Sequence, residues 1–378
     1  MFLYWLLFMM FACGAVFTMR QTHMPVYRPT YPGSPAAIGQ PVPPPQTSHK
    51  ALLFASLIPI ILIGFRYHVG SDYPTYAAIF QRVSHLSLAS SFEEADVGYA
   101  ALNWAVAQFG AGFWLVNLVC GILFTYGLIQ FASVQPSPWL AVTVAIPYLV
   151  ITVGMGYTRQ SVAIGMAMAG LAALGRGAFP KFVAYVLIGG IFHRSVIVLI
   201  PIIMLAYSRN RLVAISAGAL GSIAGYWVLT SGGGYEHLRE VYVTHARLES
   251  EGAGVRLAMN IPPAIIFLLF MKQLAPEKHE RLTYAILSII AFISLFLLYL
   301  YPAASTPLDR MALYVIPLQL FVLSRLPSVF SDAAGHPSAP LTIGIISYSA
   351  VVEFVWLNYS AFAIDWIPYQ FYPLHLFD

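Results

Sequence analysis

The densest group of polar and ionisable residues lies at positions 66–76, which read RYHVGSDYPTY and follow an apolar run. The guanidinium of Arg66 can bind a phosphate through its planar fork. Asp72 can accept a proton or a hydrogen bond from a sugar hydroxyl. The alternative is an interfacial cap, in which tyrosines form an aromatic belt around a snorkelling arginine.

A second polar group occupies residues 154–160, which read GMGYTRQ. A glycine-containing turn feeds a helix that we expect to begin near Gln160. Backbone N–H groups at a helix N-terminus, together with Arg159, make an anion site. The alternative is a plain interhelical turn with one exposed arginine.

Three further groups carry ionisable residues inside or beside apolar segments. His193 and Arg194 interrupt an apolar stretch between Phe192 and Ser195. Ionisable residues at membrane depth are functional candidates by default, although a lone histidine can also be a packed core residue. Asp309 and Arg310 open a late apolar segment, where they are either part of a site or a solvated helix end. Glu353 lies within the last segment and either pairs with an arginine or snorkels outwards.

Metal and nucleotide chemistry have no local support, because no HExxH, CxxC or GxxxxGK[ST] pattern occurs. We therefore expect no metal and no cofactor. Several arginines on one face of a membrane fit a polyanionic, lipid-linked substrate better than a neutral solute.

The elements that position these residues must be membrane helices. Of 378 residues, 59% are hydrophobic and 9% are charged, against about 25% charged in soluble domains. This composition excludes a cytosolic enzyme, a nucleic-acid binder and a secreted disulfide scaffold. We predict an all-α polytopic membrane protein, a single integral membrane domain over residues 1–378. About twelve apolar segments are expected, at 2–18, 51–65, 113–132, 138–153, 160–175, 181–192, 195–207, 212–230, 256–271, 281–301, 309–326 and 341–360.

Two of these segments, 181–192 and 195–207, are too short to cross about 30 Å. We predict a broken, re-entrant helix pair that meets in a polar dip at His193, because one long helix would place two charges in mid-bilayer. Short basic loops indicate the cytoplasmic side. On that basis we expect the proline-rich segment 19–50 to be cytoplasmic and the loops 66–112 and 231–255 to face outwards. No basic region precedes segment 2–18 and Arg20 follows it, so we expect a retained first span with its N-terminus outside.

The sequence resembles the EpsG family of Wzy-like exopolysaccharide and O-antigen polymerases. The resemblance rests on an ordered set of short motifs along most of the chain. They are Arg66-Tyr-x-Val-Gly70-x-Asp72-Tyr73-x-x-Tyr76, Glu94 with Gly98-Tyr99 ahead of Leu102-Asn103, Arg159-Gln160, Phe192-His193-x-Ser195 with Pro201, Arg310 with Tyr314, and Pro368-Tyr369. The long proline-rich segment 19–50 departs from the short loop expected there.

The resemblance implies a bacterial cytoplasmic-membrane glycosyltransferase with an architecture like that of the all-helical, lipid-dependent GT-C enzymes. Such proteins join oligosaccharide repeat units carried on undecaprenyl pyrophosphate at the outer face of the membrane. The expected partners are this lipid-linked oligosaccharide and the bilayer, with no nucleic acid, and other polysaccharide synthesis or export proteins are further candidates.

Within that scheme the candidate residues receive roles. Arg66, Arg159 and Arg310 are predicted to bind the pyrophosphate, because the leaving group needs charge stabilisation. His193 or Asp72 is predicted to deprotonate or orient the acceptor hydroxyl. Tyr73, Tyr76 and Gln160 are assigned to the sugar.

Three alternatives stay open from the residues alone. One is a non-enzymatic transporter or flippase of lipid-linked oligosaccharides, which would line a passage reachable from both faces. A second is a membrane O-acyltransferase, a class that uses a buried histidine with an asparagine some tens of residues upstream. It is disfavoured, because no asparagine lies between Asn117 and His193. A scaffold subunit would leave the ordered motifs unexplained.

Overall fold

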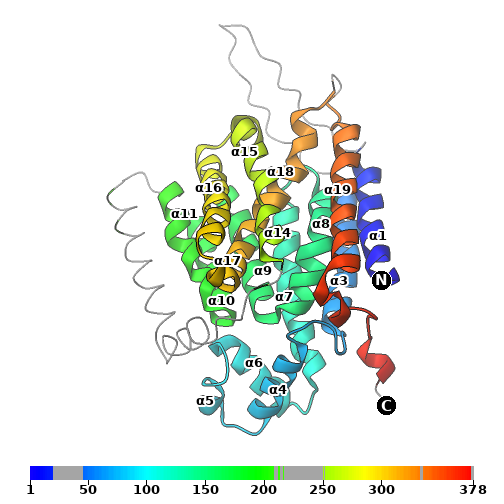
Figure 1. Cartoon of the computed structure of the whole chain (residues 1–378), viewed down its shortest axis with the longest axis vertical. Helices are drawn as coiled ribbons and strands as arrows, with labels where there is room; N and C mark the ends of the chain where they lie inside the picture. Colours follow the sequence, from blue (N-terminus) through cyan, green and yellow to red (C-terminus); the bar gives the residue numbers. More distant parts are fainter. Residues whose placement is uncertain are drawn as a thin grey trace.

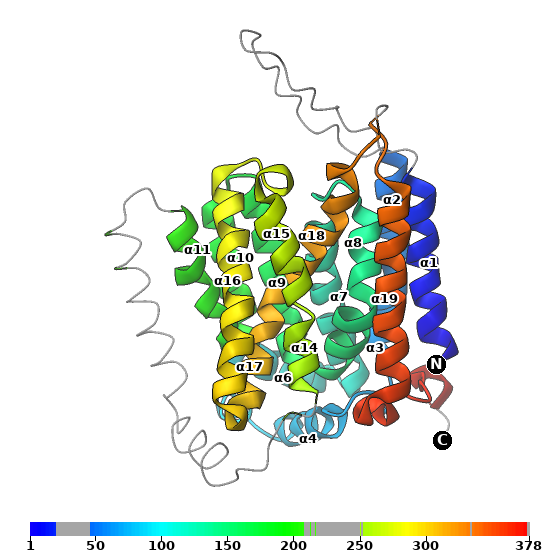
Figure 2. The ribbon, with the colours of Figure 1, turned by 45° about the horizontal axis from the view of Figure 1, so that its top comes forward.

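The computed structural model describes residues 1–19, 46–207, 250, 252–332 and 335–375, together with Leu212 and Ser216. Every element in this part of the chain is helical, apart from one isolated β-bridge between Arg66 and Phe371. Figures 1 and 2 show a bundle of roughly parallel helix axes, with short helices α4, α5 and α6 gathered at one end. The all-α prediction is thereby confirmed.

The elements follow the predicted apolar segments closely. They are α1 (Phe2–Met19), α2 (Gln46–Ala55), α3 (Leu57–Gly64), α4 (Tyr73–Ser84), α5 (Leu88–Ser91), α6 (Val97–Gln108), α7 (Phe113–Ala132), α8 (Pro138–Ala145), η1 (Ile146–Gly154), α9 (Thr158–Gly175), α10 (Phe179–Phe192), η2 (Arg194–Val198), α11 (Leu199–Tyr207), α14 (Ala253–Ala258), α15 (Ile261–Leu274), α16 (Lys278–Leu300), η4 (Pro302–Ala304), α17 (Ser305–Ala312), η5 (Leu313–Val315), α18 (Ile316–Val329), α19 (Ala339–Tyr359), η6 (Ala361–Asp365) and η7 (Tyr372–His375).

Six helical stretches of the described residues are long and apolar enough to cross a membrane. They are Phe2–Met19, Phe113–Ala132, Ala253–Leu274, Lys278–Leu300, Pro302–Val329 and Ala339–Tyr359. The prediction of about twelve spans is therefore not confirmed, because several predicted segments form helices too short to cross on their own. A GT-C-like architecture is likewise not confirmed. The predicted segment 212–230 and most of the predicted loops 19–50 and 231–255 lie outside the described residues.

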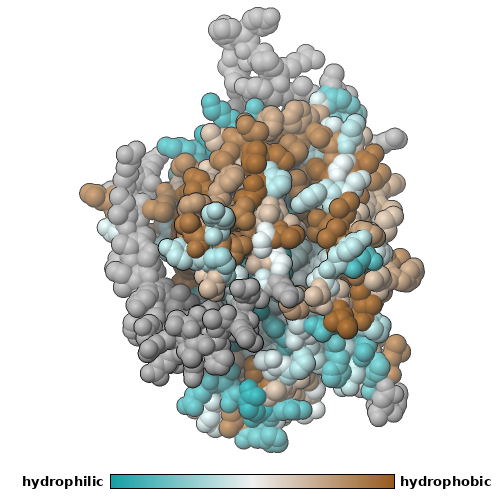
Figure 3. Space-filling view, viewed as in Figure 1, coloured by the Kyte–Doolittle hydropathy of each residue, from teal (hydrophilic) through white to brown (hydrophobic). Residues whose placement is uncertain are grey.

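Helix α9 is the centre of the bundle, since all of its residues are buried except Arg159 and Gly175. It packs closely on α7, where a side chain at Gly127 would collide with the backbone of Gly165. Small residues let membrane helices approach in this way. Helices α16 and α19 instead expose large apolar side chains, as expected of surfaces that face lipid. Figure 3 shows this apolar surface over the helices and a hydrophilic one at the end that carries α4–α6.

Helices α10 and α11 form the predicted broken pair. His193 ends α10 with an extended backbone, φ −154° and ψ 102°, and η2 begins at the next residue. The pair folds back on itself, because the hydroxyl of Tyr207 donates to the carbonyl of Gly177 at 3.0 Å. The ring of Tyr207 also stacks on Phe179 at 4.9 Å between centroids. The far ends of both helices thus lie together, and His193 lies at the bend.

The segment 66–72 is fixed against the chain's last turns and the start of α9. The N–H of Tyr67 donates to Gln370, and the N–H of Gly70 donates to Asp365. Gly70 has a φ of +101°, and a side chain there would approach the carbonyl of Met155 to 2.7 Å. A glycine is therefore required for this segment to reach the turn that precedes α9.

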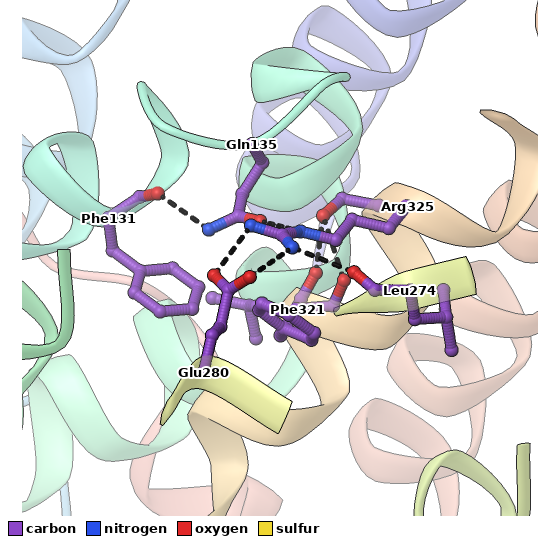
Figure 4. A network of polar contacts seen from close by, with 8 residues as sticks. Phe131, Gln135, Leu274, Glu280, Phe321 and Arg325 are labelled. Carbon is purple, nitrogen blue, oxygen red and sulfur yellow. Dashed lines mark hydrogen bonds and ion pairs between the residues drawn. The ribbon is translucent and has the colours of Figure 1, made fainter. Parts of the chain in front are cut away.

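A polar network ties four helices together at the opposite end of the bundle (Figure 4). Arg325 of α18 makes two ion contacts of 3.0 Å with Glu280 of α16. The same guanidinium donates to Gln135 and to the carbonyl of Leu274, both at 2.8 Å. It also lies 3.8 Å over the ring of Phe321. These partly buried charges are partnered with each other, so the network fixes α18 against α16, the end of α15 and the turn that follows α7.

Candidate functional site

Three arginine–aspartate pairs lie at the end of the bundle that carries α4–α6. Arg159 contacts Asp96 at 3.1 Å, Arg310 contacts Asp72 at 3.5 Å, and Arg256 makes two contacts of 2.9 Å with Asp309. Their exposure differs in a graded way. Arg310 and Asp72 are 35% and 33% exposed, whereas Arg256 and Asp309 are 16% and 6% exposed. The Arg310–Asp72 pair is therefore the longest, most accessible and most easily displaced.

Arg159 lies where the first turn of α9 meets the start of α6. Besides Asp96, its guanidinium faces the rings of Tyr76 and Tyr99, at 5.7 and 6.0 Å from their centroids. Its side chain keeps 29% of its surface exposed, although the rest of α9 is buried. The N-terminus of a helix attracts anions through its free backbone N–H groups. The guanidinium of Arg159 adds its positive charge at the same place, so the two together favour binding of an anion.

His193 joins the same group from the bend between α10 and η2. Its Nδ1 lies 3.6 Å from Asp96 Oδ2, and its side chain is 26% exposed. Burial lowers the pKa of His193, Asp96 raises it, and the positive charges of Arg159 and Arg310 lower it again. The pKa therefore lies below its ordinary value, which keeps the ring neutral as a base requires.

Arg310 is held from three sides. Its guanidinium lies 3.8 Å over the ring of Tyr157, in the turn that precedes α9. Gln160 donates from Nε2 to the backbone carbonyl of Arg310 at 2.6 Å, so α9 and α17 are joined directly. Asp72, the residue before α4, supplies the weaker third contact. Gln160 is 2% exposed, and its contact is with the backbone of Arg310.

Arg66 behaves differently from the other arginines, because it is 0% exposed. Its guanidinium donates to the carbonyl of Ile63 and to Oγ1 of Thr158, each at 2.7 Å. Thr158 is the first residue of α9, so Arg66 holds the start of the helix that presents Arg159. The geometry supports a positioning role for Arg66, and direct binding of pyrophosphate by this residue stays a prediction.

The two predicted sugar-binding tyrosines have different surroundings. Tyr76 packs on Tyr99 at 5.6 Å and faces Arg159, which connects it to the pairs described above. Tyr73 lies in an aromatic cluster with His68 and Phe113, at 5.1 and 5.4 Å. The structure brings together Asp72, Tyr76, Arg159, Gln160, His193 and Arg310, and it leaves Tyr73 beside them and Arg66 beneath them.

Reasoning from the sequence missed two ionisable residues of this site, Asp96 and Arg256. Two acidic residues precede Asp96, and of these Glu94 pairs with Arg82 at 2.6 Å on the surface. The position of Asp96 directly before an apolar helix was the available signal. Arg256 had none, since it sits in an apolar segment remote in sequence from Asp309.

Two observations concern groups outside the pairs. Glu353 is 0% exposed, and neither of its carboxyl oxygens has a hydrogen-bond partner among the described residues. It therefore neither snorkels outwards nor pairs with an arginine of that part of the chain.

Within the described ranges, no group of three His, Cys, Asp or Glu side chains is placed to hold a metal ion.

Comparison with known proteins adds one finding. The model of the EpsG family matches residues 50–371. The match spans every residue of the three arginine–aspartate pairs and His193, and it begins after the proline-rich segment. No match was found among curated proteins or among solved structures.

Proposed function

Because the chain belongs to the EpsG family, whose members are Wzy-like polymerases, we propose that it polymerises lipid-linked oligosaccharides. Family membership implies a membrane protein with a polysaccharide-polymerase type of function. The finer proposal is that it joins repeat units carried on undecaprenyl pyrophosphate. We further propose that the end carrying α4–α6 lies at the outer face of a bacterial inner membrane and that the reaction takes place there.

The observation that carries this proposal is the convergence of arginines on one end of an apolar bundle. Arg159 and Arg310 are partly exposed cations on the first turn of α9 and on α17, and each is held by an aspartate. A pyrophosphate can displace the weaker carboxylate contact, because charge-assisted forked bonds to phosphate are stronger than one contact of 3.5 Å. The surrounding apolar helices would accommodate the polyprenyl chain.

The reaction would be a displacement at the anomeric carbon of the donor sugar. The acceptor hydroxyl oxygen forms the new bond to that carbon, and the bond from the carbon to the pyrophosphate oxygen breaks. The hydroxyl proton passes to His193, whose ring is neutral and within reach of the same polar group. Arg159 and Arg310 stabilise the negative charge that develops on the leaving pyrophosphate.

The remaining predicted residues take supporting roles in this scheme. Asp72 orients Arg310 before substrate arrives and is the second candidate for receiving the acceptor proton. Gln160 and Tyr76 shape the floor around Arg310 and Arg159, where a sugar next to the pyrophosphate would lie. Partners beyond the lipid-linked substrate and the bilayer, such as other synthesis or export proteins, follow from the family alone.

The test uses membranes of the producing cells from which this gene has been deleted, since these accumulate lipid-linked repeat units if the proposal is right. Purified protein is added without any nucleotide sugar, and chain length is followed by gel electrophoresis of the released glycan. We expect elongation with the wild-type protein and little with Arg159→Lys. Movement of repeat units across the membrane without elongation would instead identify a flippase.

A further inference from the structure

Asp96 stands between two candidate groups that come from different helices. Its Oδ2 atom lies 3.1 Å from Nη1 of Arg159 and 3.6 Å from Nδ1 of His193. Arg159 belongs to the first turn of α9, and His193 ends α10. The side chain of Asp96 is 13% exposed, and the same oxygen faces both groups.

The side chain of Asp96 is not used to cap its own helix. Asp96 directly precedes α6, a position where aspartate commonly accepts from a backbone N–H of the first turn. Here the side chain makes no such bond, and only its backbone carbonyl accepts, from the N–H of Ala100. The carboxylate is directed instead across the site towards α9 and α10.

We propose that Asp96 is a positioning residue that fixes His193 with its proton on Nδ1 and thereby leaves Nε2 as the atom that receives the acceptor proton. This inference rests on the proposed function and assigns the orientation of its base. A carboxylate can only accept hydrogen bonds, so the imidazole nitrogen that faces it must be the one that donates. The contact of 3.6 Å is longer than a hydrogen bond, and such contacts tighten as charge develops on the ring.

The same carboxylate would also compensate the charge that forms during reaction. When Nε2 takes the hydroxyl proton, the ring becomes an imidazolium, and Asp96 is the anion beside it. Asp96 itself remains ionised throughout. Burial raises the pKa of this carboxyl, but contact with His193 and the positive charges of Arg159 and Arg194 outweigh burial and keep the pKa below its usual value.

A pH profile separates this role from simple packing. The charged groups that act on His193 are Asp96 before α6, Arg159 on α9 and Arg310 on α17. Asp96 is the one anion among them, and it raises the pKa of the ring. Removing its charge would lower that pKa, so the acidic limb of the activity profile would move to lower pH.

The experiment compares Asp96→Asn, Asp96→Ala and the control Glu94→Gln in membranes that contain accumulated lipid-linked repeat units. Glu94 precedes Asp96 by two residues and pairs with Arg82 on the surface, so its neutralisation should change nothing. An amide at position 96 can donate to Nδ1 and favour the wrong tautomer. For Asp96→Asn we expect kcat to fall about 10²- to 10⁴-fold, with a small change in KM.

For both Asp96 variants we expect the acidic limb to move to lower pH. Adding His193→Gln to Asp96→Asn should cause little further loss, because the two residues act as a unit. Full activity of Asp96→Asn, or a loss explained by lower abundance with an unshifted pH profile, would overturn the inference. Wild-type protein that elongates nothing would refute the proposed function instead, so the two failures are distinguishable.

Discussion

Replacing Arg310 by lysine tests whether its guanidinium binds the pyrophosphate. Lysine keeps the positive charge near Asp72 but loses the planar fork and the flat stack on Tyr157. Gln160 bonds to the backbone of residue 310, so this link between α9 and α17 survives the substitution. The change therefore removes recognition while it preserves charge and architecture.

The size of the effect follows from the contacts that are lost. One charge-assisted hydrogen bond to phosphate is worth about 1.5–3 kcal/mol. The stack over Tyr157, 3.8 Å from the ring centroid, contributes about 0.5–1 kcal/mol at a site that is partly exposed. Part of the stack is kept by an ammonium, so we expect a loss of about 2–3 kcal/mol in kcat/KM, or about 30- to 150-fold.

The assay measures elongation of lipid-linked repeat units against their concentration in reconstituted membranes. Arg82→Lys is the matched control, because Arg82 is 53% exposed and pairs with Glu94 away from the site. Activity is normalised to the amount of folded protein. If Arg310→Lys keeps kcat/KM within about threefold of the wild type, Arg310 does not bind the pyrophosphate through its fork.

Three further outcomes are expected. Arg66→Lys should lower the free energy of unfolding by about 1–3 kcal/mol, because one ammonium cannot serve both acceptors of the buried guanidinium. Activity per folded molecule should fall less in this variant than in Arg310→Lys. In detergent, Arg325→Leu should cost about 3 kcal/mol, the lower end of the range for a buried pair, by leaving the partly buried Glu280 without its arginine. Leucine at both positions should recover most of the melting temperature; equal loss in the single and double variants would contradict this. Cysteines introduced one at a time at Glu94 and Lys278, in a Cys13→Ser background in which the remaining Cys120 is buried, should react with an impermeant thiol reagent from opposite sides of the membrane. Labelling from one side at both sites would refute the proposed orientation.

The positions of many helices could be predicted from the sequence, because apolar runs between polar turns identify membrane segments directly. The predicted segment 113–132 coincides with α7, and the predicted break at His193 is the observed end of α10. His193 and Arg194 lie side by side inside an apolar stretch, and a bend keeps these two ionisable side chains out of the middle of the bilayer. The number of spans is not confirmed among the described residues, because an apolar run does not reveal whether its helix is long enough to cross.

Residues of the candidate site could be predicted from the sequence only where their position beside a turn indicates which residues surround them. Arg159 lies in the first turn of α9 and Arg310 in the last turn of α17, and both are found at the candidate site. The depth of Arg66 could not be predicted, since an arginine at the end of an apolar run is equally compatible with a surface position. The partners of Asp96 and Arg256 lie 63 and 53 residues away, and such pairings are set by how helices pack in three dimensions.

The pairing of each site arginine with its own aspartate has a consequence for turnover. Three bare arginines would retain any lipid that carries a pyrophosphate, including the carrier left behind after each transfer. With the aspartates in place the three pairs carry no net charge, and under the proposed function each carboxylate would return to its arginine as the carrier departs. The aspartates would then act as built-in counter-ions that weaken retention of the spent carrier, and the longest pair, Arg310–Asp72, is where this exchange would require the least separation of charge.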